Sequence, residues 1–174
     1  MRIKSVLPIA TAICILAALL STTAACAVSV KSLLPAKNSV KGWSILADSL
    51  QYGKGNGLTS IYNGGYELYT KNGVVDAARQ MYQRGNDYVE VTIHTMKSGK
   101  AAIDFLKYWQ KQNKVKSLSR TKKSSYFTLA KPNTAVYFVT GKYLTTVNAF
   151  HAAEKAKKDV MAFMNVIEGN ASKR

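Results

Sequence analysis

"DAARQMYQRGNDYVEVTIHTM", residues 76 to 96, decides the fold, because it holds two extended runs separated by the turn-forming triplet Gly-Asn-Asp at 85 to 87. Two sets of side chains alternate along the second run, namely Val89, Val91, Ile93 and Thr95 against Tyr88, Glu90, Thr92 and His94. Alternation with a period of two places the sets on opposite faces of a β-strand. A short Gly/Asn/Asp segment between two such runs is typical of a β-hairpin, which we therefore predict here.

A helix is expected directly after the hairpin. Ser98 is a residue type that caps helix N-termini, and the residues after it separate into an apolar and a polar face. The apolar face holds Ala102, Phe105, Leu106 and Trp109, and the polar face holds Lys100, Asp104, Lys107 and Lys111. We expect the apolar face to pack on the sheet.

The chain from 124 to 150, "SSYFTLAKPNTAVYFVTGKYLTTVNAF", supplies three more strand-like runs. Pro132-Asn133 and Gly141-Lys142 separate these runs and predict turns. A last helix follows, with an inward face of Ala156, Val160, Phe163, Met164 and Ile167. We expect this helix to end at Gly169, because glycine is common where helices stop.

A further helix is predicted upstream, through the stretch "SIYNGGYELY" at 60 to 69. Apolar residues recur there with helical spacing, at Leu58, Ile61, Tyr62, Gly65, Leu68 and Tyr69. Asn72-Gly73 predicts its C-terminal end. Each glycine inside a helix costs about 1 kcal/mol relative to alanine, so we expect Gly64 and Gly65 to allow close approach of a neighbouring backbone. The alternative is a tight turn that presents amides to a ligand.

The order of helix, hairpin, helix, three strands and helix predicts an α+β fold, with an antiparallel sheet of about five strands and about three helices packed mainly on one face. We expect a single domain at residues 43–169 and a short tail at 170–174. Residues 28–42 contain Pro35 and Gly42 and show little amphipathic period, which favours a tether between the N-terminal segment and the domain.

Residues 1–27 have the layout of an export signal. Arg2 and Lys4 precede an uncharged apolar run, and small residues follow before the next charge. Both cysteines of the chain, Cys14 and Cys26, lie within this segment. The rest of the chain therefore has no thiol for a disulfide framework or a structural zinc site, and we expect no cofactor.

Three outcomes of export remain open. The first is cleavage after Ala27, which follows a small-x-small pattern. The second treats "TAAC" at 23 to 26 as similar to the bacterial lipoprotein signal, with Thr in place of the usual Leu, and would attach a lipid to Cys26. The third is an uncleaved anchor formed by residues 6–30, which are long enough to cross a bilayer.

Four segments together resemble a family of exported bacterial proteins of unknown function. They are "LLPAKNSVKGW" at 33 to 43, "SIYNGGYELYTKNG" at 60 to 73, "MYQRGNDYVEVTIHTM" at 81 to 96 and "GKYLTTVNAF" at 141 to 150. The resemblance spans residues 33–168. It departs from the family at Tyr66, where a small residue is usual, and at Lys97-Ser98-Gly99, where an acidic or glycine-rich loop is usual. The resemblance implies an α+β fold and an envelope location, with no catalytic residue to transfer.

No catalytic or metal-binding constellation is evident in the sequence. The two histidines are His94, on the polar side of its strand, and His151. Glu90 and His94 share a strand face, but at about 3.3 Å per residue their backbones lie roughly 13 Å apart, so we predict that His94 is a surface residue. An exported enzyme is the alternative function, and it requires Glu67, Glu90, His94 or Asp104 to converge in a pocket between sheet and helices.

Charge is the remaining functional signal. Without Arg2 and Lys4, 23 of the 25 Lys and Arg residues remain against nine acids, which gives a net charge of +14. No carboxylate occurs between Asp104 and Glu154, while nine cations do: Lys107, Lys111, Lys114, Lys116, Arg120, Lys122, Lys123, Lys131 and Lys142. We expect the first seven, which we call the basic cluster, to form a contact surface, although a merely solvated face is the alternative.

A positive field of this kind attracts an anionic membrane surface, an acidic cell-wall polymer or an acidic protein partner. Nucleic acid is disfavoured, because export separates the protein from it. Tyr108, Trp109, Tyr126 and Phe127 lie among the cations as a base-stacking surface requires, but the periodicity already assigns part of this set to the core. We therefore predict a non-enzymatic envelope protein, lipid-tethered or free, with a basic face.

Overall fold

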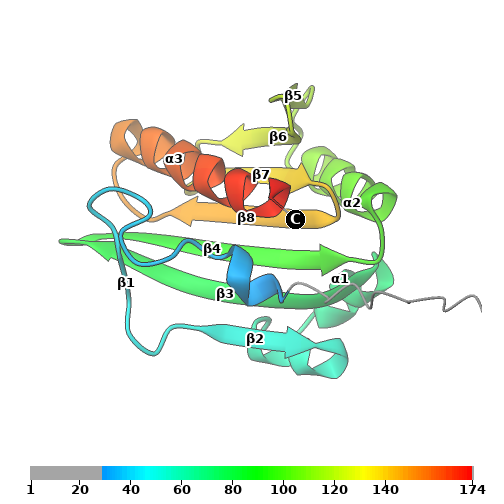
Figure 1. The fold of residues 1–174 in the computed structure, drawn as a ribbon. Coiled ribbons are helices and arrows are strands. Elements are labelled where there is room, and N and C mark those ends of the chain that lie inside the picture. The colour runs from blue at the N-terminus through cyan, green and yellow to red at the C-terminus, as the bar shows by residue number, and fades with distance from the viewer. Residues whose placement is uncertain (1–28, 174) are drawn as a thin grey trace, which may run out of the picture.

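The computed structural model describes residues 29–173, which form one antiparallel sheet with helices on both of its faces (Figure 1). The strands are β1 Ser44–Ile45, β2 Gln51–Lys54, β3 Val74–Arg84, β4 Asp87–Met96, β5 Ser119–Arg120, β6 Ser124–Leu129, β7 Thr134–Thr140 and β8 Tyr143–Ala149. The helices are the 3-10 turns η1 Val30–Leu33 and η2 Gly55–Ser60 and the α-helices α1 Tyr66–Lys71, α2 Gly99–Gln112 and α3 Ala153–Ser172. The strand order is β1-β3-β4-β8-β7-β6-β5, and β2 also pairs with β3.

The predicted hairpin is confirmed and forms the long arm of the sheet. β3 and β4 pair antiparallel from Arg84 opposite Asp87 to Val74 opposite Met96, and Gly85 makes the turn with a φ of +58° that favours glycine. The three later runs are also confirmed as β6, β7 and β8. The α+β class is therefore correct, but the sheet described here has eight strands rather than about five. β1, β2 and β5 were missed because runs of two to four residues are too short to show a period.

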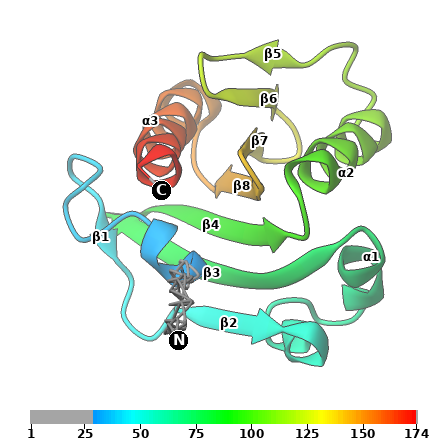
Figure 2. The same ribbon diagram turned by 45° about the vertical axis from the view of Figure 1, so that its right-hand side comes forward.

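Helices cover both faces of the sheet, which corrects the prediction that they gather on one (Figure 2). On one face, α3 and η1 pack on residues such as Val91, Ile93 and Phe138. On the other face, α1, η2 and α2 pack on residues such as Met96 and Leu144. The central strands carry apolar side chains on both sides, so both sides need a covering layer.

The predicted faces of α2 and α3 are confirmed. The Ser98 hydroxyl accepts a hydrogen bond from the Ala101 amide at 3.1 Å and so caps α2. All five expected inward residues of α3 are buried. The predicted end at Gly169 is wrong, since α3 continues to Ser172 and takes in most of the predicted tail. The Asn170 amide donates to the Leu33 carbonyl at 3.1 Å, which ties the last turns of α3 to η1.

The prediction of a tether at residues 28–42 is also wrong for its described part. Val30 and Leu33 have 0% exposure and belong to the core beneath α3, and Val40 joins them. The Tyr82 hydroxyl donates to the Pro35 carbonyl at 2.9 Å and fixes the segment to β3. Val30 and Leu33 are three residues apart, which matches the period of a 3-10 turn, so the single turn η1 buries both side chains.

The predicted export signal, its cleavage or lipidation and the anchor lie outside the described residues, apart from the last two residues of the anchor.

The helix predicted from residue 58 is interrupted at the glycine pair. η2 ends at Ser60, and α1 begins only at Tyr66. Gly64 and Gly65 have φ values of +88° and +71°, and a Cβ added to either would meet no atom within 4 Å. The packing interpretation is therefore wrong, because these glycines form an open turn rather than a close contact. The predicted stop is confirmed, as α1 ends at Lys71.

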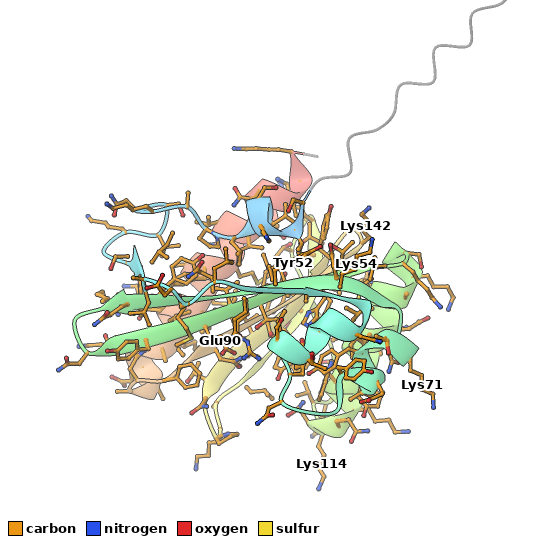
Figure 3. The ribbon with its side chains drawn as sticks, turned by 90° about the horizontal axis from the view of Figure 1, so that it is seen from below. Tyr52, Lys54, Lys71, Glu90, Lys114 and Lys142 are labelled. Carbon is orange, nitrogen blue, oxygen red and sulfur yellow. The ribbon has the colours of Figure 1, made fainter. Side chains whose placement is uncertain are left out.

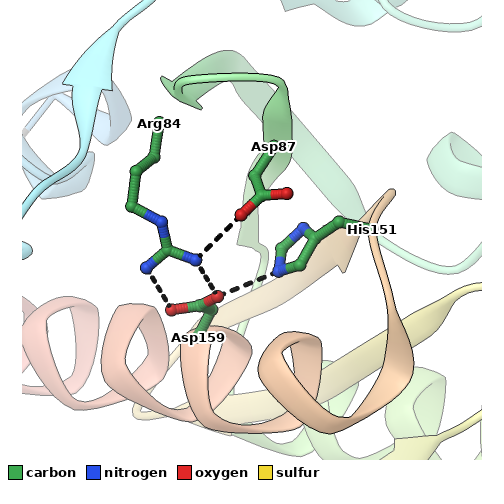
Figure 4. A network of polar contacts seen from close by, with 4 residues as sticks. All are labelled: Arg84, Asp87, His151 and Asp159. Carbon is green, nitrogen blue, oxygen red and sulfur yellow. Dashed lines mark hydrogen bonds and ion pairs between the residues drawn. The ribbon is translucent and has the colours of Figure 1, made fainter.

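A polar network fastens the tip of the hairpin to α3 (Figure 4). Arg84 forms a two-pronged pair with Asp159, at 2.9 Å from Nη1 to Oδ1 and 2.6 Å from Nη2 to Oδ2. The His151 Nε2 lies 2.9 Å from Asp159 Oδ2, and Arg84 Nη2 also donates to Asp87 Oδ2 at 3.2 Å. The guanidinium stacks over the Trp43 ring at 4.5 Å. We assign this network to stability, because it joins elements of the core.

Within residues 29–173, no helix combines the length and the apolar character that crossing a bilayer requires.

Candidate functional site

All seven members of the basic cluster are exposed and lie around α2, β5 and the start of β6. Lys107 and Lys111 are on the outer face of α2, and the others follow in the chain as far as the turn before β6. No member forms an ion pair with any acid in the described part of the chain. Asp104 and Glu168 are the acids placed beside the cluster, through the charge of Lys107 and the Thr121 hydroxyl, so cations outnumber acids there and a net positive field extends into solvent.

Part of the basic cluster lines a groove between α2 and the β5–β6 edge of the sheet. The groove has a volume of about 410 Å³. It is lined by Gly99, Ile103, Arg120, Thr121, Lys122, Lys123, Ser124, Ser125, Val139 and Gly141. Lys107 and Lys111 lie one and two turns beyond Ile103 on the same stripe of α2, since residues four apart share a helix face. Arg120, Lys122 and Lys123 thus line the strand side of the groove. Lys107 and Lys111 extend the row of cations along α2 beyond the end of the groove.

The α2 part of the basic cluster and η1 lie on opposite sides of the sheet. α2 belongs to the layer that covers one side of the sheet, and η1 belongs to the layer on the other side. Figure 3 shows this separation, with Lys114 at the lower edge of the view and η1, in blue, above the strands. The strand part of the cluster lies closer to η1, because the Thr121 hydroxyl donates to Glu168 on α3 and the Asn170 amide, two residues further along α3, donates to the Leu33 carbonyl.

A second feature is a polar cavity of about 130 Å³ on the α1–α2 face of the sheet. Its floor follows directly from the strand register. Arg79 pairs with Thr92, Thr92 with Thr146, and Thr146 with Tyr137, so one row of side chains crosses four strands. The neighbouring row pairs Glu90 with Asn148, and the row on the other side pairs His94 with Leu144. Tyr62, Tyr69 and Trp109 complete the lining.

The prediction that His94 is a surface residue is wrong, because it is only 2% exposed. Its Nδ1 lies 3.0 Å from the Leu144 carbonyl, which can only accept, so Nδ1 carries the proton. Nε2 then accepts the hydroxyl hydrogen of Tyr62. Burial lowers the pKa of His94 to about 4, although its hydrogen bond to Leu144 opposes the shift. The side chain is neutral near pH 7, with both nitrogens occupied.

The glycine turn places two tyrosines over His94. The Tyr62 and Tyr69 rings stack with centroids 3.7 Å apart, and the Tyr69 ring stacks on the imidazole at 5.5 Å. Burial raises the pKa of the Tyr62 phenol above its ordinary value, and Tyr69 beside it adds to the shift. The positive φ of Gly64 and Gly65 lets the chain reverse between these rings. The stretch is thus a turn, as the alternative interpretation has it, and it shapes one wall of the cavity.

Two of the four residues required by the enzyme hypothesis line this cavity. Glu90 and His94 do so, whereas Glu67 is exposed on α1 and Asp104 pairs with Lys100 at 2.6 Å on the surface. Glu90 lies 3.5 Å from Arg79 Nε, measured from Oε2. A histidine with a pKa near 4 and no free nitrogen is poorly matched to proton transfer near neutral pH. The arrangement is therefore suited to binding more than to acid–base chemistry.

Several cavity residues were missed in the sequence, although one of them had a signal. A turn at Gly85 and Asn86 fixes the pairing of the hairpin, so Arg79 must face Thr92 and share a side with Glu90. Tyr137 and Asn148 carry no such signal, because their strands join the hairpin only through tertiary pairing. Among residues 29–173, no three His, Cys, Asp or Glu side chains gather as ligands for a metal ion.

No protein-family model matches the chain, and a search of curated protein sequences finds no similar one. Among solved structures, the chain is similar to the extracellular domain of PknH from Mycobacterium tuberculosis, with 13% sequence identity and a TM-score of 0.48. The alignment covers 83% of this chain and 95% of that domain. At this level the similarity supports no inference about function.

Proposed function

We propose that this protein is an exported, non-enzymatic cell-envelope protein that binds an anionic polymer along the groove beside α2. The observation that carries the proposal is the set of seven exposed cations without acidic partners in the described chain, gathered on one surface. The layout of residues 1–27 supports export. Membership of the family of exported bacterial proteins that the four segments resemble is part of this proposal.

Two features favour a polymer over the membrane surface. The cations border a groove, which fits an extended chain better than a flat bilayer. If Cys26 carries a lipid, at most about 11 Å of chain joins it to Ser29, so η1 would lie next to the bilayer and α2, with its cations, would lie on the far side of the sheet (Figure 3). The Ser125 hydroxyl along the groove adds a donor for phosphate or carboxylate oxygens.

The test measures, by fluorescence anisotropy, the binding of fluorescein-labelled polyphosphate to the protein. The protein is expressed from the full sequence and purified with whatever N-terminal processing the expressing cell carries out. The test variant replaces five cations by glutamine, at Lys107, Lys111, Arg120, Lys122 and Lys123. The matched control replaces five exposed lysines elsewhere, at Lys37, Lys41, Lys54, Lys155 and Lys157. Both variants lose the same charge, so a general charge effect weakens them equally.

We expect the test variant to bind polyphosphate at least about tenfold more weakly at low salt than the control variant, because each contact cation contributes on the order of 1 kcal/mol. The difference should shrink as salt rises, since screening weakens exposed charges. Equal binding by the two variants would show that the basic cluster is a solvated face and not a binding surface. Tighter binding to phosphatidylglycerol vesicles than to polyphosphate would favour the membrane instead.

A further inference from the structure

We propose that the cavity between the sheet and α1–α2 binds one ring of a neutral sugar. This inference is independent of the basic groove. The cavity is enclosed by Tyr62, Tyr69 and Trp109 over a floor of strand residues. A volume of about 130 Å³ exceeds the 10 to 15 Å³ that one water needs several times over, so there is room for a small ring but not for a large ligand.

The floor supplies hydrogen-bonding groups of both kinds. Thr92, Thr146 and Tyr137 contribute hydroxyls, each of which donates and accepts, and Asn148 contributes both an amide donor and a carbonyl acceptor. Arg79 Nε is buried and makes no hydrogen bond, although it lies 3.5 Å from a Glu90 oxygen. A buried donor without a partner is costly, so a ligand oxygen would satisfy it. Sugar hydroxyls match this mixture, because each is also donor and acceptor.

The charges in the cavity favour a neutral ligand. Arg79 and Glu90 face each other and offset one another, and His94 is neutral because burial disfavours its charged form. An anionic ligand would be repelled by the carboxylate, and a cationic ligand by the guanidinium. A purely apolar ligand would leave the polar floor unpaired, which is unfavourable in a buried site.

Aromatic walls complete the match to a sugar ring. Trp109 and Tyr137 lie with ring centroids 6.2 Å apart, and Trp109 is at the same distance from Tyr69. Such rings pack on the C–H faces of a sugar while its hydroxyls point to the polar floor. The stack of Tyr62 and Tyr69 on His94 fixes one wall before any ligand binds, and this preorganisation lowers the entropic cost of binding.

The inference is tested with glucose, galactose and N-acetylglucosamine as probes, and with glucuronic acid and glucosamine as charged comparators. Titration calorimetry of the full chain measures affinity, and tryptophan fluorescence locates the site, because Trp109 lines the cavity whereas Trp43 lies in the other core cluster. We expect at least one neutral sugar to bind saturably and to change the fluorescence, and each charged comparator to bind more weakly.

Four variants and one matched control test where the sugar binds. Asn148→Ala and Thr146→Val each remove a floor group and should weaken binding about tenfold. Asn165→Ala, on the exposed side of α3, is the matched control and should bind like wild type. Trp109→Phe should abolish the fluorescence change. Thermal melts verify that each variant is folded. Thr146→Ser, which keeps the hydroxyl, should retain binding.

The inference is overturned if none of the three neutral sugars binds at concentrations up to about 10 mM. It is also overturned if glucuronic acid or glucosamine binds more tightly than the neutral sugars, or if Asn165→Ala and Asn148→Ala lose affinity equally.

Discussion

Acid should destabilise this protein well above the pH at which carboxylates titrate, because His94 is buried and neutral. The unfolded chain binds a proton at His94 below its ordinary pKa of about 6.5, whereas the folded protein resists protonation until about pH 4. A folded pKa below the unfolded one means that the unfolded state binds more protons in this window. The free energy of unfolding must therefore fall as pH falls.

The size of the effect follows from the two pKa values. Between pH 7 and pH 5 the linkage relation gives a loss of about 2 kcal/mol, with a slope that approaches about 1.4 kcal/mol per pH unit. The groups that face the imidazole are Tyr62 and Tyr69 from the turn and α1, Arg79 from β3 and Leu144 from β8. Urea unfolding of the full chain at pH 7, 6 and 5, at constant ionic strength, measures the loss.

Two variants identify the responsible group. His94→Gln can still donate to Leu144 and accept from Tyr62, but it cannot titrate, so most of the pH dependence between 7 and 5 should disappear. His151→Gln removes the other histidine of the chain and should keep the loss. A wild-type stability that is flat from pH 7 to pH 5, or an undiminished slope in His94→Gln, would refute the reasoning.

Three further predictions concern the turn, the hairpin network and export. Gly65→Ala and Gly65→Leu should each cost about 1 to 2 kcal/mol in urea unfolding, because the cost comes from the positive φ and the added side chain meets open space; a far larger loss for leucine would restore the packing interpretation. Asp159→Asn should cost about 2 to 3 kcal/mol, since it leaves Arg84 with only the longer pair to Asp87, and loss of less than 0.5 kcal/mol, the usual scale of surface changes, would contradict that role. Hydrogen bonds from Arg84 and His151 outweigh burial and lower the pKa of Asp159, so its contribution should vanish only as pH falls below about 4. Intact-mass measurement of membrane and soluble fractions should find a chain that begins at Cys26 or Val28, and a chain that retains residues 1–27 would exclude both.

The long periodic elements of the fold could be predicted from the sequence. The hairpin, α2 and α3 follow from side-chain patterns that extend over ten or more residues. β1 and β5, with two residues each, have no readable period and exist because a neighbouring strand offers pairing partners. The burial of Val30 and Leu33 is likewise a tertiary effect, since the sheet surface beneath α3 provides the apolar site that they fill.

The candidate sites divide in the same way. The basic cluster was predicted because charge is visible residue by residue. The polar cavity was not, because its walls come from segments distant in the chain. His94 looks like a surface residue when only its own strand is considered. It becomes buried because Tyr62 and Tyr69, about 30 residues earlier, fold over it.

The most direct test of the proposed function is a lysine footprint. The full chain is acetylated briefly with and without polyphosphate, and mass spectrometry compares the modification of each lysine. The groove assignment predicts protection of Lys107, Lys111, Lys122 and Lys123, with no change at Lys155, which is exposed on α3 on the other face of the sheet. Protection of Lys155 to the same degree as the groove lysines, or no protection at any lysine, would contradict it.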